Sequence, residues 1–116
     1  RQTVARRYNA AFAGKFVTPF VAEGCVSAYA QYALLAKDRE QRDRIIASLD
    51  QSGIPNMVYY PTPQHALPVF QNEPCYGETF PNARDYCDRT FSVPMHPYLE
   101  DTDQKVIIQT VLGAII

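Results

Sequence analysis

The sequence contains no tryptophan, only two histidines and only three cysteines. No two cysteines form a C-x-x-C pair, and neither histidine stands at the spacing of a zinc finger. An odd number of irregularly spaced cysteines is typical of a protein in a reducing compartment rather than of a disulfide scaffold. We therefore expect free, partly buried thiols at Cys25, Cys75 and Cys87, no metal site and a cytoplasmic location.

An excess of charge of either sign is also missing. Eleven Lys and Arg residues stand against twelve Asp and Glu residues, and the net charge is -1. A nucleic-acid-binding domain would carry a basic stripe, and a protein that binds anionic membranes would carry a basic cluster. No apolar run approaches the roughly 18 to 20 residues that span a bilayer. The sequence thus argues against nucleic acid and membranes as partners.

The common catalytic and nucleotide-binding motifs are absent as well. Neither G-x-x-x-x-G-K, G-x-G-x-x-G nor G-x-S-x-G occurs. The three lysines, Lys15, Lys37 and Lys105, stand among polar residues, outside any apolar stretch that would suit a nucleophilic amine. No acid–base pair can be assembled from the remaining side chains. We therefore assign no catalytic residue.

The chain has 116 residues, of which 47% are hydrophobic and 20% charged. This length and composition are those of one soluble globular domain with a single core. The length is short for a complete enzyme that holds a cofactor and a large substrate. Because the first residue is Arg1 rather than methionine, we expect the chain to be a piece of a longer one.

The first third of the chain alternates between helical and extended patterns. Apolar residues at four-residue steps predict a helix over residues 1–12. Residues 20–22 are a possible short strand. Residues 27–36 are nearly all apolar and predict a buried strand, in which Gln31 would need a hydrogen-bond partner.

The clearest helix is predicted over residues 38–51. Asp38, followed three residues later by Gln41, has the spacing of a capping box. Gly53 stands where a helix commonly ends in a left-handed glycine. A second strand is predicted directly afterwards, over residues 56–60.

The region from residue 55 to residue 97 holds eight of the nine prolines. Proline lacks a backbone N–H and interrupts long elements. We therefore predict an ordered loop with short helical turns, one of them around residues 66–70.

The last third of the chain predicts two helices and a strand. A short helix over residues 82–89 would be capped by Asn82, and residues 90–93 form a third strand. Asp101 and Gln104 repeat the capping-box spacing before an amphipathic final helix. Together these elements predict an α+β domain with a small, mostly antiparallel sheet of three or four strands and helices packed on one face. The other face of such a sheet would need cover from outside the chain.

The segment most suggestive of binding is VYYPTPQHALPVF, from residue 58 to residue 70. Tyrosine and histidine rings stack and form directional hydrogen bonds, which suits a polyhydroxylated or nucleotide-linked ligand. The alternative is structural: Tyr59 and Tyr60 would alternate between core and solvent, and His65 would cap a turn. His96 is interpreted as a structural loop residue.

Four segments in register resemble one known family. RQTVARRYNAAF resembles its basic helix R-x-x-x-A-x-x-Y, and SAYAQYALLAKDREQRD resembles its S-x-x-x-x-Y strand and charged helix. SGIPNMVYYPTPQHALPVF resembles its G-I-P…Y-Y-P-x-P-x-H segment, and FPNARDYCDRTFSVPMHPYLEDTD resembles its P-x-A helix followed by S-L-P-M-H-P. The family is the DegT/DnrJ/EryC1/StrS family of pyridoxal-phosphate sugar aminotransferases. The whole chain, residues 1–116, resembles its C-terminal small domain, the small domain of a fold-type I aminotransferase.

The resemblance implies an activity that this chain would share with a large domain. Pyridoxal 5'-phosphate, held by a lysine of the large domain, takes an amino group from glutamate and delivers it to a ketone of a nucleotide-linked sugar. The A-Q-Y, Y-Y-P and M-H-P-Y-L segments are most similar to members that act on UDP-linked N-acetylated keto sugars in lipopolysaccharide or O-antigen biosynthesis. The resemblance also implies a homodimer with active sites near the subunit interface. No lysine of this chain matches the cofactor lysine, so the chain alone would bind no cofactor and be inactive.

Three residues match family positions that border the sugar-nucleotide pocket. Tyr60 and His65 match the Y-P…H segment, and Gln31 matches the strand position nearest the active site. Two positions depart from the family's pattern: Gln64 and Val93 stand where leucine is frequent. The Gln64 departure puts the apolar anchoring of the loop in doubt.

Two other functions compete with this interpretation. The chain could be a free-standing, non-enzymatic α+β module that uses an apolar sheet face to bind a partner. A complete small enzyme has little support, because no catalytic set of residues can be assembled.

Overall fold

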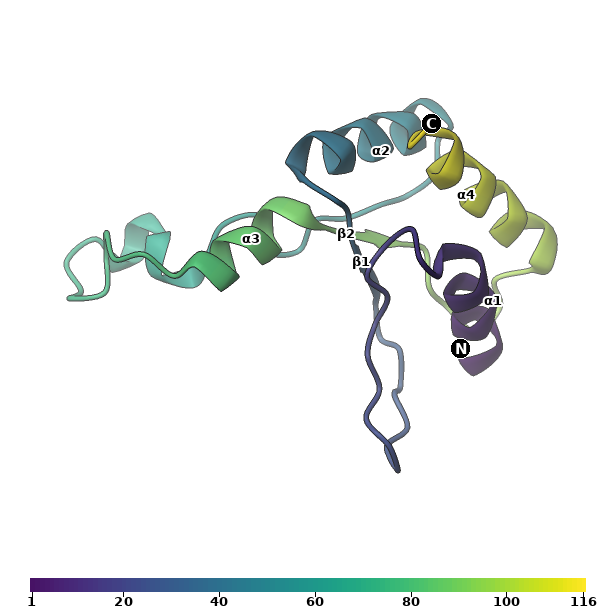
Figure 1. The fold of residues 1–116 in the computed structure, drawn as a ribbon, viewed down its shortest axis with the longest axis horizontal. Helices are drawn as coiled ribbons and strands as arrows, with labels where there is room; N and C mark the ends of the chain where they lie inside the picture. The colour runs from purple at the N-terminus through teal and green to yellow at the C-terminus, as the bar shows by residue number, and fades with distance from the viewer.

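The computed structural model describes all residues from 1 to 116 (Figure 1). Four α-helices, two strands and two 3-10 turns follow one another along the chain. In order, they are α1 (Gln2–Phe12), β1 (Tyr32–Leu35), α2 (Arg39–Gln51), η1 (Gln64–Ala66), η2 (Pro68–Phe70), α3 (Pro81–Arg89), β2 (Thr90–Val93) and α4 (Asp101–Gly113). The predicted α+β class is confirmed. None of the helices is long and apolar enough to cross a membrane.

The sheet has two strands rather than the three or four that the sequence predicts. β1 and β2 pair antiparallel, with Tyr32 opposite Val93 and Leu35 opposite Thr90. Two single bridges extend the sheet, one from Val17 to β1 and one from Met57 to β2. The strand predicted over residues 56–60 is thus reduced to the Met57 bridge, and the Val17 bridge lies outside residues 20–22, which were predicted as a possible strand.

Prolines explain why these two bridges do not grow into strands. The register that places Met57 opposite Ser92 also places Pro55 opposite Pro94. The bridge at Val17 likewise puts Pro19 at the next pairing position of its strand. A proline has no N–H to donate to the ladder, so hydrogen bonding stops there.

β1 is also much shorter than the predicted strand over residues 27–36. Tyr29 has a φ of 46°, in the left-handed region that a β-strand cannot contain. The Ser27 hydroxyl accepts a 3.2 Å hydrogen bond from the Tyr29 N–H and stabilises this bend. Residues 20–22 form no strand, and they lie in the extended loop that leads to the bend (Figure 1).

Both ends of α2 follow the chemistry read from the sequence. The Asp38 carboxylate accepts from the Gln41 N–H at 2.8 Å, and the Gln41 side chain accepts from the Lys37 N–H at 2.8 Å. At the other end Gly53 adopts a φ of 67°. The N–H groups of Gly53 and Ile54 bond back to the carbonyls of Asp50 and Leu49, which is a Schellman motif.

Two other predicted helix caps are wrong. α3 begins at Pro81, and its capping position is Phe80 rather than Asn82. Proline is favoured at this first position because a first-turn N–H has no helical partner. At the start of α4, Asp101 and Gln104 form no capping box. Gln104 is instead fully buried and faces α1.

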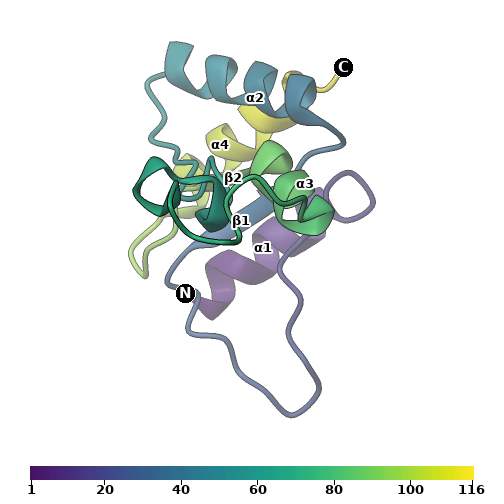
Figure 2. The same ribbon diagram turned by 90° about the vertical axis from the view of Figure 1, so that its left-hand side faces the viewer.

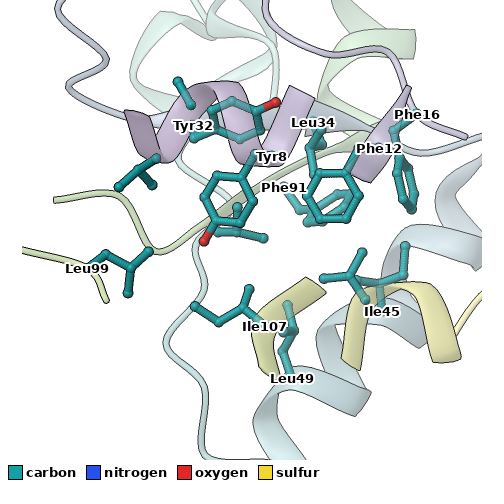
Figure 3. Close-up of a cluster of buried hydrophobic side chains, with 14 of the residues drawn as sticks. Tyr8, Phe12, Phe16, Tyr32, Leu34, Ile45, Leu49, Phe91, Leu99 and Ile107 are labelled. Atoms are coloured by element: carbon teal, nitrogen blue, oxygen red, sulfur yellow. The ribbon is translucent and has the colours of Figure 1, made fainter. Parts of the chain in front are cut away.

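The core lies on one face of the two-stranded sheet (Figure 3). Tyr32 and Leu34 of β1 lie opposite Val93 and Phe91 of β2, and all four side chains are buried. Helices α1, α2 and α4 cover this face. They contribute Tyr8 and Phe12, Ile45 and Leu49, and Ile107 and Val111, respectively. The prediction that helices pack on one face is confirmed for these three.

Buried polar side chains connect the elements around this core. The Gln104 amide donates to the Val4 carbonyl at 2.7 Å and joins α4 to α1. Arg42 of α2 is buried, and its guanidinium donates to the Cys87 carbonyl at 3.2 Å. The Tyr8 hydroxyl donates to the Pro94 carbonyl at 2.8 Å. The first two bonds join helices to one another, and the third holds the end of β2 against α1.

Residues 58–80, here called the arm, project away from the three core-covering helices. α3 connects the far end of the arm back to the sheet (Figures 1 and 2). The whole molecule measures 49 × 37 × 24 Å. The predicted turn around residues 66–70 corresponds to η1 and η2 within the arm.

Replacing the buried Gln104 with alanine should lower the free energy of unfolding by about 2 kcal/mol, through a lost hydrogen bond and a cavity. The matched variant Gln109→Ala changes an exposed glutamine of the same helix and should stay within about 0.5 kcal/mol of the parent. Urea unfolding followed by circular dichroism measures both. Equal losses in the two variants would contradict the role assigned to Gln104.

The buried tyrosines should make the fold sensitive to alkali. Burial raises the pKa of both Tyr8 and Tyr32 above the ordinary tyrosine value. The unfolded chain therefore releases these protons at lower pH than the folded chain. Their contribution to stability is complete below pH about 10 and is lost as the pH rises above it.

The urea concentration at the unfolding midpoint should therefore decrease as the pH rises from 9 to 11, the range about the ordinary tyrosine pKa. The double variant Tyr8→Phe, Tyr32→Phe should show a shallower decline than the parent. Tyr98→Phe, which alters a residue that is 86% exposed, serves as the control. The same slope in all three proteins would refute the assignment.

Candidate functional site

Two hollows lie beside the arm. The first, here called the Gln31 hollow, has a volume of about 200 Å³ and lies where the chain enters β1 and leaves β2. The second, here called the arm–α3 groove, has a volume of about 480 Å³ and lies between the arm and α3. The polar residues of the first are Gln31, Asn56, Tyr59 and Ser92, and those of the second are Tyr60, Thr62, Gln64 and Tyr86.

Gln31 is exposed rather than buried, and its side chain forms no hydrogen bond within the protein. It lies in the Gln31 hollow together with Tyr59. The amide of Asn56, in the same hollow, is already bound to the Asp50 carboxylate at 2.7 Å. Among the polar side chains of this hollow, those of Gln31, Tyr59 and Ser92 form no hydrogen bond within the protein and are free to bind a ligand.

Tyr60 lies in the arm–α3 groove and is 65% exposed. Its neighbour Tyr59 is 49% exposed and lines the other hollow. The structural alternative, in which one of the two tyrosines enters the core, is therefore wrong. Two consecutive residues instead line two different hollows.

His65 belongs to η1 and lines neither hollow. Its ring lies edge-on to the ring of Phe80, with centroids 4.5 Å apart and an interplanar angle of 63°. Phe80 immediately precedes α3, so this contact joins η1 to the end of the arm from which α3 starts. The three predicted site residues thus share no single cavity.

Four further residues belong to this region and were not predicted as site residues: Tyr59, Gln64, Phe80 and Tyr86. Tyr86 lies on α3, and only the folding of α3 against the arm brings it near Tyr60. Phe80 could have been noted as a large apolar residue directly before a proline. Gln64 was noted only as a departure from the family's leucine.

Cys87 lines the arm–α3 groove and is buried. Burial raises the pKa of its thiol. Cys25 is exposed and Cys75 is half-buried, and all three cysteines are free.

The lysines of the chain do not meet the needs of a pyridoxal-phosphate site. Such a site requires a lysine in an enclosed pocket and a carboxylate facing the pyridine ring. All three lysines are exposed, and Lys105 is paired with Asp101 at 2.6 Å, which lowers the pKa of that carboxyl. The residues of this chain do not fit the cofactor.

Comparison with known proteins places the chain in a family. The profile of the DegT/DnrJ/EryC1/StrS aminotransferase family matches residues 1–112. The chain belongs to this family. The sequence-based resemblance is thereby confirmed at the level of the family, whose members are sugar aminotransferases.

Two curated members of the family are similar in sequence. The UDP-2-acetamido-2-deoxy-3-oxo-D-glucuronate aminotransferase of Pseudomonas aeruginosa is 33% identical over 108 residues, which is 92% of this chain and 28% of that protein. The dTDP-4-dehydro-2,3,6-trideoxy-D-glucose 4-aminotransferase of Saccharopolyspora spinosa is 30% identical over 111 residues, 92% of this chain and 27% of that protein. The chain thus spans less than a third of the length of these relatives.

Solved structures of the family share the fold. A DegT/DnrJ/EryC1/StrS aminotransferase from Brucella abortus is 34% identical with a TM-score of 0.85, over 97% of this chain and 29% of that one. The sugar aminotransferase Spr1654 of Streptococcus pneumoniae, in its PMP form, is 25% identical with a TM-score of 0.86, over 97% and 29% of the two chains.

The ring contact between His65 and Phe80 predicts that Phe80→Ala frees the His65 ring. The signals of the His65 ring should move toward those of an unstructured histidine, because the neighbouring aromatic ring is lost. Two-dimensional ¹H–¹³C NMR measures this change. Tyr76→Ala, which removes another exposed ring of the arm, should leave the His65 signals in place. Unchanged His65 signals in Phe80→Ala would contradict the contact.

Proposed function

We propose that residues 1–116 are the C-terminal small domain of a pyridoxal-phosphate-dependent aminotransferase. The complete enzyme moves an amino group from glutamate to a keto group of a nucleotide-linked sugar. The observation that carries this proposal is the family match over residues 1–112, joined to 33% identity with an enzyme named for a UDP-linked 3-keto sugar. Because the chain covers only 28% of that relative, most of the active site lies outside it.

In this proposal the chain forms the substrate side of the active site. Gln31, Tyr60 and His65 contact the nucleotide-linked sugar. Gln31 and Tyr60 are exposed, and their side chains form no hydrogen bond within the protein, so their polar atoms are free for a ligand. Amide, phenol and imidazole groups match the hydroxyl and N-acetyl groups of a sugar.

The proposed nucleotide is a pyrimidine nucleotide, and the preferred substrate is a UDP-linked N-acetylated keto sugar. The two relatives are named for a UDP-linked and a dTDP-linked sugar, and uracil and thymine are both pyrimidine bases. The relative at 33% identity is named for an acetamido sugar. The product would be an amino sugar for a bacterial surface polysaccharide such as lipopolysaccharide, made in the cytoplasm.

The cofactor is proposed to be bound by a large domain outside residues 1–116. It supplies the electron sink for amino transfer. This chain orients the sugar toward it and excludes water from the substrate side. The arm also carries exposed rings at Tyr76 and Phe80, and aromatic residues of this kind are typical anchors of protein interfaces. We assign the cover of these rings to the large domain and to a second subunit of a homodimer.

The chain alone should therefore retain no pyridoxal phosphate. After incubation with the cofactor and desalting, its absorption spectrum should show protein bands only, because no lysine lies in an enclosed pocket. The complete protein encoded by the gene, treated in the same way, should retain the cofactor. If the 116-residue chain retained pyridoxal phosphate and lost it when a single lysine was replaced, the assignment of the cofactor to a large domain would be refuted.

In the complete protein, Tyr60→Phe and Gln31→Ala should each raise the KM for the nucleotide sugar about tenfold, which corresponds to about 1.4 kcal/mol. The KM for glutamate should stay unchanged, since these residues are assigned to the sugar substrate. Steady-state assays with a UDP-linked keto sugar measure both constants. Tyr98→Phe is the control on an exposed tyrosine away from both hollows. The proposal would be overturned if the enzyme turned over without a nucleotide-linked sugar. It would also be overturned if neither variant changed the KM for the nucleotide sugar.

A further inference from the structure

Three basic side chains border one hollow at the β1 edge of the sheet. This space, here called the basic hollow, has a volume of about 300 Å³. Lys15, Lys37 and Arg89 line it, and its remaining lining residues are uncharged. No carboxylate lines it. In a chain with a net charge of -1, these residues form a local concentration of positive charge.

Backbone and side-chain hydrogen bonds hold the walls of the basic hollow in place. Val17 and Leu35 exchange two backbone bonds, of 3.1 and 3.2 Å. The Ala36 N–H donates to the Arg89 carbonyl at 3.0 Å, and the Arg89 guanidinium donates to the Ala36 carbonyl at 2.7 Å. Three segments that are distant in the sequence are thereby fixed around one space.

The two lysines of the basic hollow have no partner within the protein. The structure contains seven ion pairs, and none of them includes Lys15 or Lys37. Both residues are exposed. The third lysine of the chain, Lys105, is in an ion pair. Because Arg89 is paired with Asp85 at 2.7 Å, the two lysines supply the charge of the hollow that is not compensated.

Unpaired ammonium groups around a hollow of this size suit a small anion that carries two or more charges. Phosphate groups match lysine and arginine, because phosphate oxygens accept charge-assisted hydrogen bonds from several donors at once. A nucleic acid would need a longer basic stripe. An anionic membrane is bound by clusters of roughly four to eight basic residues. A group of three cations therefore favours a small phosphorylated molecule.

We infer that the basic hollow binds the phosphate group of a small phosphorylated molecule, with Lys15, Lys37 and Arg89 as donors. The hollow shares no lining residue with the Gln31 hollow or the arm–α3 groove. It lies at the β1 edge of the sheet, whereas the arm starts at the β2 edge. The inference does not rest on the proposed function. A bound phosphate would hold the end of α3, through which the chain returns from the arm, against the turn that follows α1.

The test uses the complete protein encoded by the gene, with inorganic pyrophosphate as the probe. The protein is treated with an acetylating reagent in phosphate-free buffer at increasing pyrophosphate concentrations, and mass spectrometry measures the acetylation of each lysine. Pyrophosphate should protect Lys15 and Lys37 in a saturable way and leave Lys105 unprotected. Sodium chloride at the same ionic strength should protect none of the three, because screening alone provides no bound ligand.

Matched variants separate a shared site from general screening of charge. In Lys37→Gln, the pyrophosphate concentration that half-protects Lys15 should rise about tenfold or more, through the loss of one charge-assisted hydrogen bond. Lys105→Gln removes the same charge away from the hollow and should leave that concentration unchanged. The inference would be overturned by equal effects of the two variants, by equal protection of all three lysines or by the absence of saturable protection. It would also be overturned if Lys15 and Lys37 did not react without pyrophosphate, because the hollow would then be covered in the complete protein.

Discussion

The fold depends on the pairing of β1 with β2. Two strands of four residues each cannot hold together in water without an apolar cover. Their shared face carries Tyr32, Leu34, Phe91 and Val93, and helices α1, α2 and α4 bury it. β1 and β2 lie far apart in the sequence, so their pairing also brings together the N-terminal helix α1 and the C-terminal helix α4. Gln104 and Val4 then join these helices by a buried hydrogen bond.

The same pairing sets where the arm can go. Met57 bonds to Ser92 in both directions, at 3.2 and 2.8 Å, and this bridge starts the arm at the edge of β2. Beyond it, the backbone N–H groups of the arm that form hydrogen bonds donate within the arm itself. Because prolines prevent further backbone hydrogen bonds between the arm and β2, the arm leaves the sheet. The chain then returns to the sheet through α3. The site is therefore built by a segment that the core holds only at its two ends.

The sequence predicted most of the elements that local chemistry decides. Asp38, Gln41 and Gly53 fix the two ends of α2 through hydrogen bonds within a few residues, and these ends are as expected. Gln104 and Tyr29 were misjudged for the opposite reason. The burial of Gln104 depends on α1, about a hundred residues away, and the left-handed backbone of Tyr29 overrides an apolar run that reads as a strand. The predicted strand lengths were wrong because they depend on the register of strand pairing. Register decides which prolines lie opposite one another, and it is a tertiary property.

The candidate site was predictable only in part for the same reason. Tyr60, His65 and Gln31 could be selected by motif. The motif does not show that Gln31 and Tyr60 line two different hollows or that His65 lines neither. The division follows from Tyr59 and Tyr60, whose consecutive side chains enter different hollows. A substrate with two chemically distinct halves fits such an arrangement better than a compact one does. Under the proposed function, residues of the arm contact the substrate while the core holds the arm only at its ends, so changes in the arm would alter substrate choice without disturbing the core.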